Sequence, residues 1–282
     1  MIVQEKSKEI RPDEVYNALK TLQEMRPLIH CISNIITANF CANGLLALGC
    51  SPVMAHHPAE VGEITSRAAA LSLNMGALED FEAMKVAAAK ANEVGHPIVI
   101  DPVGVAASTY RRERCFELMD TAMPTCIRGN KSEILALLEN RSTAGGVDAK
   151  VDAKDIPGPE DFIKKMQQFA GEKHLILVAS GKEDIVTDGT ETYLVANGDP
   201  LMAKITGSGC LSGAVLSAVL YLNKSARMAA IACGIMGIAG QKAAGLTKEL
   251  EAGTMTFEKY FIDSLSLLGL SDCEIINVSR LP

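Results

Sequence analysis

Segments with the length and apolar pattern of strands alternate with segments of helical periodicity through the middle of this chain. The series comprises the strand 69–74, the helix 78–94, the strand 97–101, the helix 110–120, the strand 125–127 and the helix 130–138. Strands that alternate with helices of this length indicate right-handed crossovers and a mostly parallel sheet. The sequence therefore predicts an α/β fold of three layers, in which helices flank a central, mostly parallel sheet.

Further elements extend this pattern towards both ends of the chain. We predict helices at 12–25, 34–48, 58–67, 161–171, 211–220, 226–244 and 256–268, strands at 27–33, 52–55 and 174–179, and a hairpin of 183–187 with 190–196. The interval 141–157 carries a doubled Val-Asp-Ala-Lys between glycines and prolines, which favours a loop. No composition shift marks a domain boundary. We therefore predict one domain over residues 1–282, with a polar lead-in at 1–11.

Charge and cysteine usage exclude several classes of protein. The net charge of −7 argues against nucleic acid or an anionic membrane as the main partner. The longest apolar stretch, 228–238, is too short and too rich in glycine to span a bilayer. The eight cysteines form no Cys-x-x-Cys pair, and the five histidines complete no metal or triad set. We expect reduced thiols and a cytoplasmic location, and we expect the histidines to be structural or surface residues.

The stretch 204–210, Lys-Ile-Thr-Gly-Ser-Gly-Cys, precedes a small and apolar helical run. A glycine-rich turn at the start of a helix exposes unpaired backbone N–H groups, and the helix dipole adds positive potential there. Such a turn can hold a phosphate or another anion. A thiol at this place is expected to favour its thiolate form. The alternative is a plain turn before a helix, with Cys210 buried as a small apolar residue, and both interpretations stay open at this point.

Polar side chains stand where predicted strands end. Asp101 ends the strand 97–101, Arg128 follows the strand 125–127, and Ser180 follows the strand 174–179. In open parallel sheets, ligands bind outside the carboxyl ends of the strands. Glu133 opens the next helix, but it lies three residues after Asn130 and also fits a capping box that needs no ligand.

These blocks together resemble the hydroxyethylthiazole kinases of thiamine salvage, a family within the ribokinase-like superfamily. The resemblance covers nearly the whole chain and rests on ordered blocks at 39–49, 51–54, 73–78, 101–104, 127–130, 146–148 and 206–210. It implies a ribokinase-like fold and transfer of the γ-phosphoryl group of ATP, with Mg²⁺, to the primary hydroxyl of 4-methyl-5-(2-hydroxyethyl)thiazole. It also implies a homotrimer with active sites between subunits.

The resemblance assigns expected roles to individual residues. Cys210 matches the active-site cysteine, which either accepts the proton of the acceptor hydroxyl or orients that hydroxyl. Asp101 and Glu133 match acidic residues that position Mg²⁺. Arg128 and Ser180 match ATP-binding positions, the latter often Thr in the family.

Acceptor contacts are expected from Met54 and Gly207, with Asn34 nearby. The chain departs from the family pattern at Cys31 and Ser33, close to the expected acceptor pocket, which leaves the exact acceptor open. The alternatives are a kinase of another small alcohol, such as a pyrimidine or a sugar, and a nucleotide-binding sensor without turnover. The simultaneous presence of the catalytic, metal and ATP positions argues against the sensor.

Overall fold

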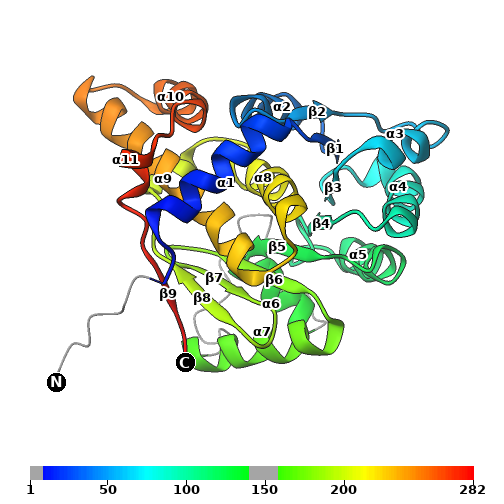
Figure 1. The fold of residues 1–282 in the computed structure, drawn as a ribbon. Coiled ribbons are helices and arrows are strands. Elements are labelled where there is room, and N and C mark those ends of the chain that lie inside the picture. The colour runs from blue at the N-terminus through cyan, green and yellow to red at the C-terminus, as the bar shows by residue number, and fades with distance from the viewer. Residues whose placement is uncertain (1–8, 140–157) are drawn as a thin grey trace.

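The computed structural model describes residues 9–139 and 158–282, whose strands form one nine-stranded sheet with helices on both faces (Figure 1). The predicted loop 141–157 lies outside the described residues, as does most of the predicted lead-in. Residues 9–11 of that lead-in are not merely polar. Ile10 is completely buried, and the Glu9 N–H donates to the carbonyl of Val278 at 3.0 Å.

Six of the nine strands are parallel. In spatial order the strands are β2 (Ser51–Val53), β1 (Leu28–Ile32), β3 (Ala70–Asn74), β4 (Ile98–Asp101), β5 (Cys126–Asn130), β6 (Ile176–Ser180), β7 (Asp184–Thr187), β8 (Thr192–Val195) and β9 (Val278–Arg280). The pairings from β2 to β6 are parallel, whereas β7, β8 and β9 add antiparallel pairs. The predicted mostly parallel sheet and the predicted hairpin are confirmed.

The parallel strands are buried on both faces because each face is covered by helices. Successive residues of β4 show this: Ile98 and Ile100 belong to one apolar cluster, and Val99 belongs to the other. The apolar run that predicted a buried strand at 97–101 is therefore explained by two separate cores, one on each side of the sheet.

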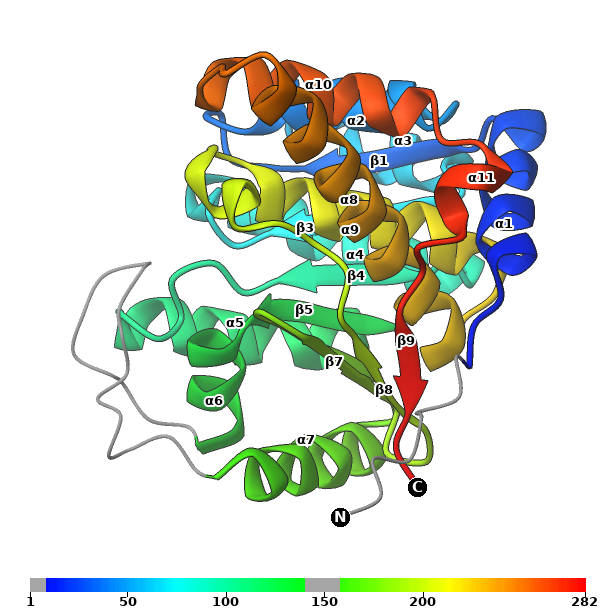
Figure 2. The same cartoon turned by 90° about the vertical axis from the view of Figure 1, so that its left-hand side faces the viewer.

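Two groups of helices supply those cores. One group consists of α1 (Pro12–Met25), α2 (Ala38–Ala47), α8 (Ser208–Leu222), α9 (Ala226–Glu249), α10 (Thr254–Ser266) and α11 (Leu270–Cys273). The other consists of α3 (Val61–Arg67), α4 (Phe81–Val94), α5 (Thr109–Ala122), α6 (Lys131–Glu139) and α7 (Pro159–Lys173). Two 3₁₀ helices, η1 (Leu78–Asp80) and η2 (Pro200–Lys204), complete the described elements. In Figure 2, α7 runs below β7 and β8, and α8 and α9 lie above them.

Helix α9 is longer than the predicted helix 226–244 and more apolar than the stretch 228–238 suggested. Its length and composition would suffice to cross a membrane, but 72% of its most hydrophobic window is buried inside the protein. Its glycines allow close packing. A Cβ at Gly237 would stand 2.5 Å from the Cβ of Asn197 and 2.7 Å from its backbone carbonyl carbon. We conclude that α9 is a core helix.

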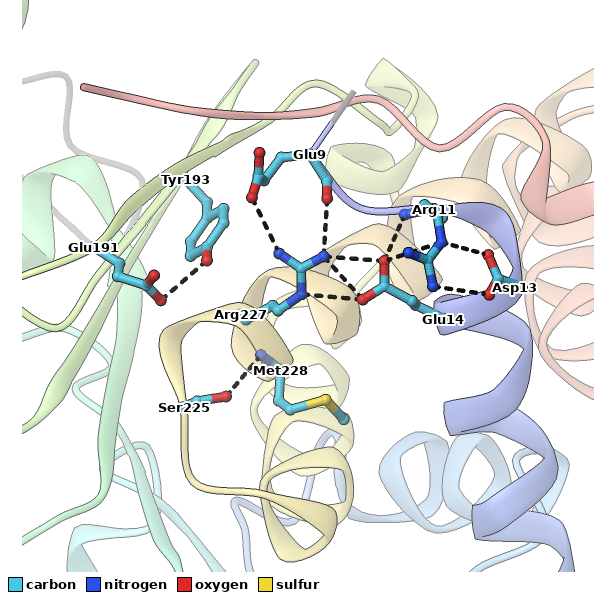
Figure 3. A network of polar contacts seen from close by, with 9 residues as sticks. All are labelled: Glu9, Arg11, Asp13, Glu14, Glu191, Tyr193, Ser225, Arg227 and Met228. Carbon is cyan, nitrogen blue, oxygen red and sulfur yellow. Dashed lines mark hydrogen bonds and ion pairs between the residues drawn. The ribbon is translucent and has the colours of Figure 1, made fainter. Parts of the chain in front are cut away.

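An arginine ties α9 to the first helix (Figure 3). The Arg227 guanidinium donates to both carboxylate oxygens of Glu14 and, at 2.9 Å, to the Glu9 carbonyl. Glu14 in turn accepts from the Arg11 backbone N–H, which caps α1. The network fixes the start of α1 against the start of α9.

Three short elements were not predicted: η2, α11 and β9. In addition, β5 extends to Asn130, and α8 begins at Ser208. The predicted glycine turn before α8 is therefore reduced to Gly207, because Ser208, Gly209 and Cys210 already form the first helical turn.

Candidate active site

Side chains from five parallel strands meet at one edge of the sheet. Asn74, Asp101, Asn130 and Ser180 are the last residues of β3, β4, β5 and β6, and Asn34 lies two residues beyond the end of β1. Asn74 stands opposite Asp101 in the parallel register, and Asn130 stands opposite Ser180. Figure 2 shows β4 and β5 pointing to this same edge. The arrangement follows the rule that open parallel sheets place their sites at the carboxyl ends of the strands.

The N-terminus of α8 faces this edge. Gly207 precedes the helix with φ of 94°, a left-handed conformation that favours glycine. A Cβ at this position would also stand 3.1 Å from Phe40 and 3.1 Å from Thr37. No side chain caps the helix, so the N–H groups of its first turn point outwards without partners from the helix itself.

Arg128 lies directly against this helical turn. Its Nη1 is 2.9 Å from the point that a Cβ of residue 209 would occupy, so only glycine leaves the guanidinium in this place. A guanidinium beside free amide groups at a helix N-terminus makes a site for a phosphate-like anion. Arg128 and the first turn of α8 thus form the candidate anion site.

Asp101 is 4% exposed and lies behind this anion site. Its Oδ2 accepts a hydrogen bond of 2.9 Å from the Asn74 amide. Burial, together with the Glu133 carboxylate, raises the pKa of Asp101 to about 7, although Arg128 and the Asn74 hydrogen bond act in the opposite direction. The protein environment therefore favours the neutral carboxyl, and a cation placed beside it would favour the carboxylate.

Glu133 forms the capping box that its spacing allowed. Its Oε2 accepts from the Asn130 N–H at 2.9 Å, and its own N–H donates to Asn130 Oδ1 at 2.9 Å. Its Oε1 accepts from the Gly104 N–H at 3.0 Å. The capping-box interpretation of Glu133 is confirmed. The same hydrogen bonds hold a buried carboxylate at the start of α6, just beyond the end of β5.

Cys210 is half-buried, and its sulfur lies 3.7 Å from the Asn34 amide nitrogen. Burial raises the pKa of the Cys210 thiol, and the nearby Asp101 adds to the rise, although Thr37, Asn74 and Arg128 oppose it. The expectation that the helix N-terminus favours the thiolate is therefore wrong for this protein. Loss of hydration and the neighbouring Asp101 carboxyl group favour the neutral thiol.

A cavity of about 660 Å³ opens onto the anion site. Arg128, Asn130 and Ser180 line its polar end. The Ser180 hydroxyl donates to the Gly129 carbonyl at 3.3 Å, which holds it beside β5. Elsewhere the lining comes from η2 and α9, which supply mostly apolar side chains, and from the polar residues Asn197 and Asp199 that precede η2.

Several residues of this cavity were missed by sequence reasoning. Lys182 lies in the turn after Ser180 and Asp184 begins β7, while Met202 and Met236 contribute apolar side chains from η2 and α9. Only the nearness of Lys182 and Asp184 to Ser180 could have indicated them. Nothing in the sequence marks the two methionines, because η2 and α9 reach the cavity only through tertiary packing.

Met54 does not line this cavity. It lies just beyond β2, is half-buried, and packs against the apolar cluster that also contacts Cys210. The two departures from the family pattern lie nearby: Cys31 is buried in the same cluster, and the Ser33 hydroxyl is 3.3 Å from that of Thr37. Gly207 lies against Thr37 and Phe40, and neither Gly207 nor Met54 is among the residues that line the cavity.

His30 and the cysteines other than Cys210 are buried, His96 is half-buried, and His56, His57 and His174 are exposed at the surface. His30 is fully buried between the Thr65 hydroxyl at 2.8 Å and the Ala55 carbonyl at 2.9 Å. The seven other cysteines are free and buried. Within residues 9–139 and 158–282, no group of three or more His, Cys, Asp or Glu side chains is arranged to hold a metal ion by itself.

Comparison with known sequences gives one consistent family. The model of the hydroxyethylthiazole kinase family matches residues 19–270. "Hydroxyethylthiazole kinase 1" of Methanosphaera stadtmanae is 37% identical over 280 residues, covering 95% of this chain and 97% of that relative. A hydroxyethylthiazole kinase of Halalkalibacterium halodurans is 38% identical over 259 residues, covering 90% of this chain and 96% of that relative.

Solved structures agree with the sequences. The hydroxyethylthiazole kinase protein of Pyrococcus horikoshii superposes with a TM-score of 0.83 at 31% identity, covering 96% of this chain and all of that one. The pyridoxal kinase of Staphylococcus aureus superposes with a TM-score of 0.56 at 16% identity, covering 76% of this chain and 87% of that one, which shows a shared fold alone. The predicted ribokinase-like fold is confirmed.

Proposed function

The chain belongs to the hydroxyethylthiazole kinase family, and we propose that it transfers the γ-phosphoryl group of ATP to the primary hydroxyl of 4-methyl-5-(2-hydroxyethyl)thiazole, with Mg²⁺. Membership of the family makes it a kinase that acts on the thiazole alcohol for thiamine synthesis. The roles of individual residues are our proposal.

One observation carries this proposal: Arg128 lies against the first turn of α8, the turn that also carries Cys210. Phosphoryl transfer needs charge stabilisation and in-line positioning more than covalent chemistry. A guanidinium and helix-terminal amides supply the charge stabilisation, and the thiol stands beside them. The cavity of about 660 Å³ supplies room for a nucleotide on one side of this turn.

In this arrangement Arg128 pairs with phosphate oxygens at the polar end of the cavity, and Ser180 contacts the same group. The adenine ring is expected near Met202 and Met236. The backbone N–H groups of residues 208–210 stabilise the negative charge that develops on the transferring phosphoryl group. Their orientation is already fixed by α8, so no reorganisation is needed during the reaction.

The acidic residues suit Mg²⁺. This ion prefers oxygen ligands and is commonly held by one or two carboxylates together with waters and substrate phosphates. The Asp101 carboxyl has one oxygen engaged by Asn74, which leaves the other for a metal-bound water. Glu133 is held in place by backbone N–H groups and would act in the same way. When bound, Mg²⁺ would neutralise charge on the nucleotide phosphates.

Cys210 orients the acceptor hydroxyl in this proposal. Because burial raises the pKa of its thiol, the neutral S–H form prevails near neutral pH. A neutral thiol can accept a hydrogen bond from the acceptor hydroxyl and hold it in line. Met54 and Gly207 would contact the thiazole ring on the α2 side of α8.

We also propose a homotrimer in which a neighbouring subunit completes the acceptor pocket. Ile35 and Ile36 are 85% and 74% exposed, although they directly follow Asn34 in the site. Two adjacent exposed isoleucines beside a catalytic centre suit burial against another subunit. Analytical ultracentrifugation at assay concentrations should give three times the mass of 30.0 kDa, and a monomer alone would contradict the shared site. The free thiols support a cytoplasmic location, where cysteines stay reduced.

The acceptor is tested by comparing the rates at which different alcohols are phosphorylated. The folded protein, supplied with ATP and Mg²⁺, is given the thiazole alcohol, a hydroxymethylpyrimidine and a sugar alcohol in separate reactions. We expect phosphate ester to form fastest, by kcat/KM, from the thiazole alcohol. Preference for another alcohol would move the proposal to a related kinase, and nucleotide binding without any ester would favour the sensor.

A further inference from the structure

A buried asparagine connects the two halves of the candidate site. Asn74 is 4% exposed and lies between Asp101, where it donates to Oδ2 at 2.9 Å, and Asn34, whose amide nitrogen is 3.1 Å from the Asn74 Oδ1. Asn34 in turn lies 3.7 Å from the Cys210 sulfur. A series of polar contacts therefore connects the carboxyl of Asp101, through Asn74 and Asn34, to the thiol of Cys210.

Backbone N–H groups fix the orientation of the two asparagine amides in this series of contacts. The Gly76 N–H can only donate, and it lies 2.9 Å from Asn74 Oδ1, so the NH₂ group of Asn74 must face Asp101. The Thr37 N–H lies 3.2 Å from Asn34 Oδ1, so the NH₂ group of Asn34 must face Asn74 and Cys210. Both amides consequently present donors, one to the carboxylate and one to the sulfur.

Gly76 is required for this geometry. A Cβ at residue 76 would stand 2.6 Å from Asn74 Oδ1 and 3.1 Å from the Asn34 amide nitrogen. Any side chain here would push the two amides apart. The close approach of the backbone is what lets one N–H set the orientation of Asn74.

We propose that Asn74 is a positioning residue for phosphoryl transfer, which aligns the Asp101 carboxylate and, through Asn34, the Cys210 thiol. This inference rests on the proposed function, but it concerns a residue for which the family resemblance predicts no role. Asn74 fixes the position of the Asp101 carboxylate, on the side proposed for Mg²⁺, relative to the Cys210 thiol, on the side proposed for the acceptor. Misplacement of reacting groups by about 1 Å costs on the order of a hundredfold in rate.

The test uses Asn74→Leu, which keeps the shape but can neither donate nor accept. We expect kcat to fall on the order of a hundredfold, while the KM for ATP stays within about threefold because Arg128 and the cavity are untouched. Alkylation of Cys210 by iodoacetamide in the free enzyme, followed by mass spectrometry, should slow at least threefold. In this variant Asn34 has lost the Asn74 oxygen that positions its amide. The Asn34 N–H therefore no longer stabilises the Cys210 thiolate, which is the form that reacts.

Two further variants decide between positioning and general stability. Asn92→Leu removes a comparable amide bond, to the Thr121 carbonyl at 2.9 Å, and should leave kcat and alkylation unchanged. Gly76→Ala perturbs the two amides without removing either and should reproduce both losses, even if Asn74→Leu fails to fold. A kcat within threefold of the parent in folded Asn74→Leu, or unchanged Cys210 alkylation, would overturn the proposal. Because alkylation needs no acceptor, it tests the link to Cys210 even if the thiazole alcohol is not the substrate.

Discussion

At the start of α8, the absence of a side chain at residue 209 is as important as the functional groups present, because it leaves room for the Arg128 guanidinium. Arg128 occupies the place where any side chain at residue 209 would begin. The sequence predicted that Arg128 and this glycine stretch belong to one site, but it contained no sign that they touch. Asn74 was seen only as part of a family block, because its role depends on Gly76 and Asn34, which meet it through the fold.

Gly209→Ala should weaken nucleotide binding by displacing the Arg128 guanidinium. We expect the dissociation constant for ATP to rise on the order of tenfold, the size of a lost charge-assisted hydrogen bond. Isothermal titration calorimetry measures it directly. Gly245→Ala, at an exposed helical glycine with open space around it, is the matched control and should bind ATP like the parent. If Gly209→Ala bound ATP with the same dissociation constant as the parent, this would contradict the prediction that Arg128 needs the space beside Gly209 to bind the nucleotide.

Replacement of Cys210 separates orientation from proton transfer. Cys210→Ala should lower kcat at least tenfold and leave ATP affinity unchanged, whereas Cys210→Ser should retain more turnover because a hydroxyl can still orient the acceptor. Steady-state kinetics with both variants provide the measurement. A fully active Ala variant would make Cys210 a packing residue.

His30 should make stability depend on pH. Burial lowers the pKa of His30 in the folded protein below its ordinary value of 6.5. The unfolded chain therefore binds more protons below that pH, so this contribution to stability is complete above about pH 6.5 and is lost as the pH falls. Urea unfolding at pH 8 and pH 5.5 should show a larger loss for the parent than for His30→Asn. Equal losses would contradict the assignment.

At the scale of elements, long periodic segments were predicted well and short ones were not. Helix α1 has the predicted bounds, 12–25, because its apolar face and its proline at the first turn are both local signals. The elements β9 and α11 escaped prediction, since three or four residues carry too little pattern and β9 exists through pairing with β8. The start of α8 was misplaced because glycine and serine favour turns, whereas packing against α2 supports helix there.

The close packing of α9 can be tested with two glycines of the same helix. Gly237→Ala should destabilise the protein by about 1–3 kcal/mol, because its Cβ would meet the backbone of Asn197. Gly245→Ala should instead stabilise it by about 1 kcal/mol, because alanine favours helix and meets nothing. Thermal unfolding should move the two midpoints in opposite directions. A Gly237 variant as stable as the parent would mean that α9 and the loop at Asn197 can move apart.

For the whole molecule, the alternation of strands and helices was enough to predict a mostly parallel sheet with helices on both faces. It also located the site, because the carboxyl ends of the strands are known once the strands are. The apolar wall of the cavity could not be predicted, since η2 and α9 come from a distant part of the chain. The single domain over residues 1–282 and the trimer stay predictions.

The central claim is that the γ-phosphoryl group of ATP moves to the thiazole alcohol. The most direct measurement is ³¹P nuclear magnetic resonance of the complete reaction with Mg²⁺, followed to exhaustion of the acceptor. We predict one phosphate monoester of the thiazole alcohol for each ADP formed, and neither product at a comparable rate from Cys210→Ala. ADP that accumulates with inorganic phosphate and without the ester would contradict the account.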